Sequence, residues 1–343
     1  MSSCVHVIDP LTDPRWDGFL ERHPRASVFH SRGWLEALKR TYGFEPAVLT
    51  TTGREPLENG LLFCRLRTCV SKRLVSLPFS DHCDPLVGSA SDLRALLEAL
   101  KVQMREGRWR SFELRPRHVE PADLPMGARY WLHTLDLRRP AAEIFRAFSA
   151  SNTQRAIRRA EREGLVCESG NSDALVSRFF GLLRLTRRRH GLPPQPFAWF
   201  TNLASCLGDR LTIYLASWDG RPVAGILTLS LKTSLVYKYG GSDSRYHSLG
   251  AMPFLFWRAI QDATARGMEE FDLGRSDLDQ PGLIAFKDHL GAVKTPLTYY
   301  SYPSHRPAAA HAGPLARAAR RIVSHLPDAA LDLTGRLLYR HLG

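Results

Sequence analysis

LTIYLASWDGRPVAGILTLSLKTSLVYKYGG, residues 211–241, reads as three consecutive strands joined by two tight turns. Its β-branched, aromatic and aliphatic side chains are typical of strands. Asp219-Gly220 is a pair that favours a two-residue hairpin, and Lys232-Thr233 marks the second turn. The stretch therefore predicts an antiparallel meander with strands at 211–218, 221–231 and 234–241.

A helix and a fourth strand follow the meander. The helix is predicted from Ala251 to Arg266, and EEFDLG at 269–274 has the composition of a short buried strand. Strand, crossover helix and strand at this spacing make a βαβ unit, so the fourth strand should run parallel to the third. A helix at 281–290 and a strand at 295–302 complete the half. Ahead of the meander we expect a basic helix near 151–164, a strand near 165–168, and helices near 173–189 and 196–207.

The first half of the chain repeats this order of elements, although we find no repeat of individual residues. We expect a strand at 4–9, helices at 14–22 and 32–41, strands in PAVLTT, GLLFCRLR and RLVSLP, a helix at 93–107, and strands at 110–116 and 130–137. The fold class is therefore α/β (α+β), with two tandem domains that each have a mixed, mainly antiparallel sheet flanked by helices. The expected boundaries are 1–139, 140–302, and 303–343 for a C-terminal tail.

Composition places the chain among soluble globular proteins. Its 343 residues, 44% of them hydrophobic, suffice for two cores. No apolar run approaches membrane-spanning length, and the start, MSSCVHVIDPLTDPRW, lacks a secretory signal, so we expect a cytoplasmic location. The net charge is +13 and most of the 47 basic residues are arginine. Nucleic acid, a nucleotide pyrophosphate or an anionic membrane surface would each suit that charge.

The cysteines are scattered and show no CxxC spacing. We interpret them as reduced, mostly buried thiols rather than a structural zinc site, and expect no metal. They are Cys4, Cys64, Cys69, Cys83, Cys167 and Cys206.

The tail from about residue 303 begins with a linker, SHRPAAAHAGP, and continues as PLARAARRIVSHLP. The second segment predicts an amphipathic helix with an apolar side around Leu315 and Ile322 and a basic side around Arg317 and Arg321. Its apolar face could pack on the first domain. Peripheral contact with an anionic inner-membrane surface is the alternative, because basic amphipathic helices bind such lipid.

Lys287 is the unusual residue of FDLGRSDLDQPGLIAFKDHLG, residues 271–291. If the helix begins at Pro281 and ends before Gly291, Lys287 falls on the apolar side of the helix, beside Leu283. An ammonium group there could snorkel along the helix surface or form one wall of an anion site.

Arginines line one face of the helix near 151–164. Arg155, Arg158, Arg159 and Arg162 follow the i, i+3, i+4, i+7 spacing. Like charges at this spacing repel. The arginine face is therefore either solvated or bound to the phosphate groups of a partner, which guanidinium groups bind with forked hydrogen bonds.

RYHSLGAMP, residues 245–253, precedes the crossover helix and offers an anion site of its own. Gly250 and Ala251 lie where N–H groups at a helix N-terminus could hold a phosphate, with His247 beside them.

Tyr237 and Tyr239 are two residues apart on a strand, which puts them on the same face. Either could stabilise an oxyanion or protonate a leaving group, and either could instead be packing.

SLPFSDHCDPLV, residues 76–87, gathers Asp81, His82, Cys83 and Asp84 in one loop. Neighbours on an extended segment point to opposite faces, which argues against a Cys-His nucleophile. We expect Asp81 and His82 to line a substrate cleft.

These motifs together resemble the FemAB-like branch of the GNAT acyltransferases, with a BioF2-like acetyltransferase domain. FDLGRS with GLIAFK, the NTQRAIRRAEREGL helix and HSRGW carry the resemblance, which covers most of residues 25–302. The best-known enzymes of the branch move an amino acid from aminoacyl-tRNA to a peptidoglycan precursor. The LP, G and RHLG pattern of the tail is similar to exopolysaccharide-associated FemAB-like proteins of exosortase systems.

The resemblance implies roles for individual residues. Lys287 matches a lysine that contacts substrate or the tRNA acceptor end, and Tyr237 or Tyr239 matches the tyrosine of the fourth strand. His30 stands where the peptidoglycan enzymes usually have Gln, and Trp199 stands where a Tyr is expected. HSLGAM has one glycine where coenzyme-A-dependent members favour a Q/RxxGxG/A loop.

We therefore expect an acyltransferase in which an amine of a cell-envelope glycan or peptidoglycan-type precursor, nucleotide- or lipid-linked, attacks the acyl carbon directly. The donor would be acyl-CoA or aminoacyl-tRNA, with no tightly bound cofactor. Tyr239 and Lys287 are the expected catalytic residues. The expected binding residues are Arg155, Arg158, Arg159, Arg162, Tyr237, His247, Gly250, Ala251, Arg275, Asp81 and His82. The alternative is a non-catalytic basic protein of the same fold that binds RNA or a membrane surface.

Overall fold

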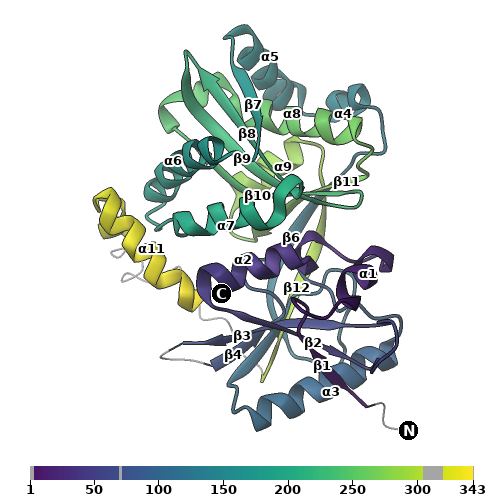
Figure 1. Ribbon diagram of the computed structural model, residues 1–343. Coiled ribbons are helices and arrows are strands. Elements are labelled where there is room, and N and C mark those ends of the chain that lie inside the picture. Colours follow the sequence, from purple (N-terminus) through teal and green to yellow (C-terminus); the bar gives the residue numbers. More distant parts are fainter. Residues whose placement is uncertain (1–3, 69–71, 304–319, 343) are drawn as a thin grey trace. The chain divides into compact units, whose positions relative to one another are not determined.

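The computed structural model describes residues 4–68, 72–303 and 320–342 (Figure 1). It divides the chain into two compact units. Unit 1 comprises Met1–Arg129, Leu297–Ala308 and Leu337–Gly343, and unit 2 comprises Tyr130–Pro296 and Ala309–Arg336. Each unit has a mixed sheet flanked by helices, which confirms the predicted fold class.

Unit 2 is built on the predicted meander. Its sheet has the order β6-β11-β10-β9-β8-β7. Strands β8, β9 and β10 are antiparallel, and β10 runs parallel to β11, so both predictions are confirmed. The strands are β6 (Met126–Asp136), β7 (Val166–Gly170), β8 (Leu211–Trp218), β9 (Arg221–Leu231), β10 (Ser234–Ser242) and β11 (Glu270–Asp277).

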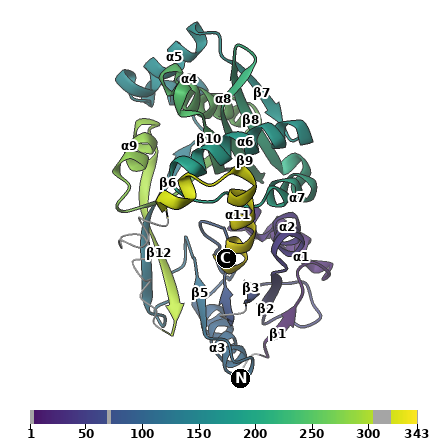
Figure 2. The same cartoon turned by 90° about the vertical axis from the view of Figure 1, so that its left-hand side faces the viewer.

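Helices cover both faces of the unit 2 sheet (Figures 1 and 2). On one face lie α6 (Asp173–Arg189) and α7 (Phe197–Leu207), followed by the short η3 (Gly208–Arg210). On the other lie α4 (Ala141–Ala147), the π-helical η2 (Ala150–Gln154), α5 (Arg155–Arg162) and α8 (Ala251–Ala265), with η4 (Ser244–Leu249) leading into α8. Helix α9 (Pro281–His289) follows β11. Gly241 sits where the α6 backbone comes closest, since a Cβ there would lie 2.4 Å from the Leu183 nitrogen.

Unit 1 repeats the arrangement. Its strand order is β1-β2-β3-β4-β5-β12, with β4 and β5 parallel and the neighbouring pairs described along this sheet antiparallel. The strands are β1 (His6–Ile8), β2 (Glu45–Thr50), β3 (Leu61–Arg67), β4 (Lys72–Val75), β5 (Ser111–Leu114) and β12 (Val293–Tyr302). The helices are α1 (Arg15–Arg22), η1 (Val28–His30), α2 (Arg32–Tyr42) and α3 (Ala90–Glu106). The repeated order of elements is therefore present in the structure.

The last strand of each half pairs differently from our expectation. We expected residues 130–137 to complete the first sheet and residues 295–302 the second. Instead, β6 pairs antiparallel with β11, and β12 pairs antiparallel with β5. The units accordingly divide at Arg129 and Tyr130 rather than near Arg139-Pro140. A strand pattern specifies extended backbone but not the partner that completes its hydrogen bonds, so sequence order alone misplaced both strands.

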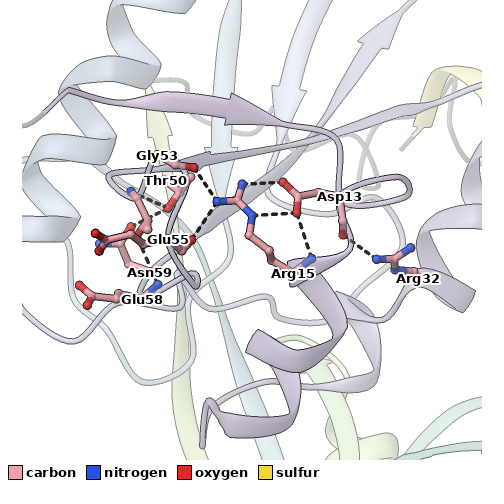
Figure 3. A network of polar contacts seen from close by, with 9 residues as sticks. Asp13, Arg15, Arg32, Thr50, Gly53, Glu55, Glu58 and Asn59 are labelled. Carbon is pink, nitrogen blue, oxygen red and sulfur yellow. Dashed lines mark hydrogen bonds and ion pairs between the residues drawn. The ribbon is translucent and has the colours of Figure 1, made fainter.

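A polar network fastens the start of α1 in unit 1 (Figure 3). The Arg15 guanidinium group donates to the carboxylate of Asp13 and to the carbonyl oxygens of Gly53 and Glu55. Beside these contacts, the Thr50 hydroxyl donates a hydrogen bond to Asn59 Oδ1 at 3.2 Å. The network joins α1 to the segment between β2 and β3.

The tail is described from residue 320 onward, so the predicted linker and residues 314–319 of the helix predicted at 314–327 lie outside the described residues. Residues 320–324 are helical. Helix α11 (Asp328–Leu342) follows. Its N-terminal part packs in unit 2, where Leu331 is buried and Asp328 pairs with Arg184 at 2.8 Å. In unit 1, Tyr339 contacts the ring of Phe79. No helix in the described ranges is long and apolar enough to span a bilayer.

The five cysteines within the described residues are free thiols, of which Cys64 and Cys83 are buried; Cys69 lies outside these residues. In the same part of the chain, no group of three His, Cys, Asp or Glu side chains is placed to hold a metal ion.

Candidate active site

Two pockets adjoin at the N-terminus of α8. The first, which we call the apolar pocket, is a cavity of about 360 Å³. It is lined by Val223, Ala224, Tyr237, Ser242, Tyr246, His247, Ala251, Met252, Pro253, Phe256, Leu283, Phe286 and Lys287. Most of these side chains are aliphatic or aromatic, and the few polar groups lie among them, as in many small-molecule sites.

The second, which we call the basic pocket, has a volume of about 420 Å³. It is lined by Asn152, Thr153, Arg155, Ala156, Arg159, His247, Ser248, Gly250, Pro253, Gly282, Ala285, Phe286 and His289. His247, Pro253 and Phe286 belong to both pockets. An elongated ligand with a charged part and an apolar part could therefore occupy both.

Gly250 lets the start of α8 approach α5. Its φ is +77°, and a Cβ there would lie 2.3 Å from the carbonyl oxygen of Ala156. Only glycine fits both the left-handed backbone and the contact. The first-turn N–H groups of Ala251 and Met252 need partners outside the helix, and Pro253 has no N–H to satisfy.

Strand β10 carries a bulge that separates the two candidate tyrosines. Its pairing with β9 shifts between Tyr237 and Tyr239. Tyr237 packs on Phe256 of α8 and lines the apolar pocket. Tyr239 packs on Phe200 of α7, and its hydroxyl accepts a hydrogen bond from Trp199 Nε1 at 2.9 Å. The prediction that both lie on one face was wrong, because the extra residue of a bulge reverses the alternation.

Lys287 is only 2% exposed, so it does not snorkel to solvent. Its Nζ donates to the carbonyl oxygens of Gly274 at 2.8 Å and Arg275 at 3.0 Å, and to the Ser276 hydroxyl at 3.0 Å. Three donors are all that an ammonium group has. The acceptors lie where the pairing of β11 with β6 is irregular, so the lysine fastens α9 to this part of β11 while its side chain lines the apolar pocket.

The four predicted arginines of α5 are all exposed but separate into two pairs. Arg155 and Arg159 line the basic pocket, and Arg159 also donates to the carbonyl of Ser248 at 3.1 Å. Arg158 instead contacts Gln154 and the ring of Phe145. Arg162 lines neither pocket.

Arg275 also lies outside both pockets. Its guanidinium group stacks on the ring of Tyr130, 4.1 Å from the centroid, and its carbonyl accepts the bond from Lys287. The contacts described for Arg275 are thus to Tyr130 and Lys287 rather than to either pocket.

Asp81 and His82 lie in unit 1. The Asp81 carbonyl accepts a hydrogen bond from the Tyr299 hydroxyl, and His82 packs edge-on against Phe29. Their neighbour Cys83 is fully buried, and burial raises the pKa of its thiol well above the usual value. A raised pKa disfavours the thiolate form that a nucleophilic cysteine requires.

Asp84 fixes the same loop. Its carboxylate accepts hydrogen bonds from the backbone N–H groups of Arg117 and His118 and from the His118 ring at 2.7 Å. Burial opposes the charge, but the bonds from His118 overcome that cost and lower the pKa of Asp84 to about 2. The backbone carbonyl oxygen of Asp84 also lies 3.0 Å from His30 Nε2, so His30 contacts the backbone of this loop.

The part of the chain that lines the two pockets matches a known protein family. Residues 148–287 match the acetyltransferase (GNAT) domain family. The UDP-N-acetylmuramoylpentapeptide-lysine N(6)-alanyltransferase of Weissella viridescens is 27% identical over 171 residues, which cover 48% of this chain and 50% of that protein. The chain is therefore similar to the FemAB-like branch of the GNAT acyltransferases, as the sequence predicted. It spans about half the length of this curated relative.

Solved structures share the fold of this chain. FemX superposes with a TM-score of 0.68 at 14% identity, covering 85% of this chain and 96% of that one. A tandem GNAT protein from the clavulanic acid biosynthesis pathway superposes with a TM-score of 0.52 at 13% identity, covering 88% and 100%. At such identities the likeness concerns the fold alone.

Several residues of this GNAT domain's pockets were not predicted. Ser242, at the end of β10, and Phe286 and Met252, on α9 and α8, line the apolar pocket. Phe286 adjoins Lys287 in the sequence, but an apolar residue on a helix predicts only packing. Ser242 carried no sequence signal, because its position depends on α6: its N–H donates to Thr186 Oγ1 at 2.8 Å.

Proposed function

We propose that this protein transfers an acyl or aminoacyl group to an amine of a cell-envelope glycan or peptidoglycan-type precursor by direct attack. The observation that carries the proposal is the meeting of the apolar and basic pockets at Gly250–Pro253, inside the GNAT domain. Such a shape suits an activated donor, which joins an acyl group to a phosphate-bearing carrier.

The basic pocket would hold the carrier. Arg155 and Arg159 supply guanidinium groups, and Ala251 and Met252 supply N–H groups at the positive end of the α8 dipole. The carrier parts of aminoacyl-tRNA and acyl-CoA both contain phosphate groups, so the proposal includes both molecules as donors. Neither requires a tightly bound cofactor.

The apolar pocket would hold the reacting acyl group. Tyr237 takes the role that we had expected of Tyr239, because its phenol lies over Gly240 on the pocket side of β10. A hydroxyl in an apolar pocket can stabilise the developing oxyanion or protonate the leaving group. Lys287 adds positive charge at the wall and keeps α9 in place.

The acceptor is proposed from the relative, whose name specifies the lysine of a UDP-N-acetylmuramoylpentapeptide. Amines of envelope precursors, including nucleotide- and lipid-linked ones, form the class to test first.

Turnover of the purified protein with charged tRNA and, separately, with acyl-CoA tests the proposal against a panel of amine acceptors. Arg155→Ala or Arg159→Ala should raise the donor KM about tenfold to a hundredfold, the effect of one lost charged hydrogen bond. Arg162→Ala, on the same helix but in neither pocket, is the matched control. Salt-sensitive RNA or vesicle binding without transfer from any donor would favour the non-catalytic alternative.

A further inference from the structure

A serine and a histidine meet at the junction of the two pockets. Ser242 Oγ lies 2.9 Å from His247 Nε2. Ser242 is 8% exposed and its backbone is fixed by Thr186, whose hydroxyl accepts from the Ser242 N–H and donates to its carbonyl. Both side chains line the apolar pocket, and His247 lines the basic pocket as well. The pair therefore borders the place where an acyl group and its carrier would join.

Arg189 favours one arrangement of the protons in this pair. Its NH1 lies 3.3 Å from the same Nε2. A guanidinium group can only donate hydrogen bonds, so Nε2 must present its lone pair. The remaining proton of a neutral imidazole then sits on Nδ1, and the Ser242 hydroxyl, at the shorter distance, shares the Nε2 lone pair with the Arg189 N–H as a second donor.

The charges around His247 favour this neutral form. Burial and the positive charge of Arg189 on α6 lower the pKa of His247, and Asp243 opposes them only in part. Asp243 is itself paired with Arg245 at 2.6 Å. From α5, Arg159 approaches the adjoining Ser248 carbonyl and adds further positive charge. His247 is thus an available base at neutral pH.

We propose that Ser242 and His247 form a proton relay that takes the proton of the attacking amine, a role that rests on the proposed acyl transfer. The amine nitrogen bonds to the acyl carbon, and the bond from that carbon to the donor oxygen or sulfur breaks, its electron pair leaving with that atom. The ammonium proton passes to Ser242 Oγ as Ser242 gives its own proton to His247 Nε2. The imidazolium then returns a proton to the leaving atom or to water.

Kinetics separate this role from simple donor binding. His247→Gln keeps a polar side chain but cannot accept the proton, so kcat should fall about 10²- to 10⁴-fold while the donor KM stays unchanged. The acid limb of the wild-type pH profile should disappear with it. Ser242→Ala should lower kcat in the same way. His190→Gln is the matched control, since His190 is exposed, adjoins Arg189 and lines neither pocket. A raised KM with unchanged kcat would make His247 a donor contact and overturn the relay.

A second measurement needs no turnover. In protein labelled with ¹⁵N-histidine, the His247 resonances, identified by their loss in His247→Gln, should show an unprotonated Nε2 at pH 7 that shifts in Ser242→Ala. A protonated Nε2 would overturn the relay whatever the kinetics show. If wild-type protein transfers from no donor, the proposed function fails, and the ¹⁵N shifts still decide where the proton lies.

Discussion

The Tyr239 hydroxyl accepts a hydrogen bond from the Trp199 indole at 2.9 Å, on the face of β10 opposite the apolar pocket. Tyr237, two residues earlier, lines that pocket. One bulged residue thus separates a tyrosine that packs on α7 from a tyrosine that lines the apolar pocket.

The two tyrosines should respond differently to loss of their hydroxyl groups. Tyr237→Phe should lower kcat at least tenfold if its phenol supports the oxyanion. Tyr239→Phe should leave kcat unchanged and lower the unfolding free energy by about 1–3 kcal/mol, because the buried Trp199 N–H loses its partner. Steady-state turnover and urea denaturation of both variants provide the measurement. The opposite result would return the catalytic role to Tyr239.

Lys287→Met should destabilise the protein. The substitution leaves the carbonyl oxygens of Gly274 and Arg275 buried beside an apolar side chain, at a cost of at least about 1–3 kcal/mol. Lys294→Met is the control, because Lys294 is half exposed and its pair with Asp288 at 3.4 Å contributes about 0–1 kcal/mol. Urea denaturation compares the two. Unchanged stability with lost turnover would instead make Lys287 a substrate contact alone.

Gly250→Ala and Gly267→Ala compare the two ends of α8. Both glycines have a left-handed backbone, with φ of +77° and +71°, so alanine should cost about 1–2 kcal/mol at either position. Only at Gly250 would the Cβ meet another group, the Ala156 carbonyl, which adds about 1–3 kcal/mol. Gly250→Ala should also raise the donor KM, and Gly267→Ala should not. Equal losses of unfolding free energy would show that α5 shifts enough to accommodate the added methyl group without a further cost.

The predictions that succeeded were local. The meander followed from strand composition and turn residues, and the parallel fourth strand followed from the length of the crossover. Helix α6 was predicted at 173–189 and runs from Asp173 to Arg189. In each case neighbouring residues alone determine the element.

The features that could not be predicted depend on distant partners. Strands β6 and β12 have patterns that suit either sheet, so only pairing with β11 and β5 places them. The β10 bulge reverses the alternation from which the tyrosine faces were inferred. Ser242 acquires its position from Thr186 and His247, and no sequence motif joins the three.

Asp84 should make the protein sensitive to acid. Its pKa is lowered to about 2 in the folded state, from about 3.9 in an unfolded chain, so its contribution is present above pH 4 and is lost as pH falls toward 2. The linkage amounts to about 2–3 kcal/mol for a shift of this size. Asp84→Asn should remove that part of the pH dependence. Asp136→Asn is the control, since Asp136 has a similarly low pKa through Arg138 but its side chain is 42% exposed, so solvent screens the pair. Denaturation from pH 5 to pH 2 measures both.

His133 should control stability in a separate pH range. Its side chain is wholly buried, and within the described residues its Nε2 has no hydrogen-bond partner, with Asp288 3.7 Å away. Burial and the nearby Lys287 lower the pKa of His133 to about 4. Between pH 6.5 and pH 4 the unfolded chain therefore binds the proton more readily than the folded one, so stability falls as pH falls through this range. His133→Phe should flatten the unfolding free energy over that range relative to wild type, while the loss below pH 4 remains. An unchanged slope between pH 6.5 and pH 4 would show that His133 titrates in the folded protein as it does in the unfolded chain.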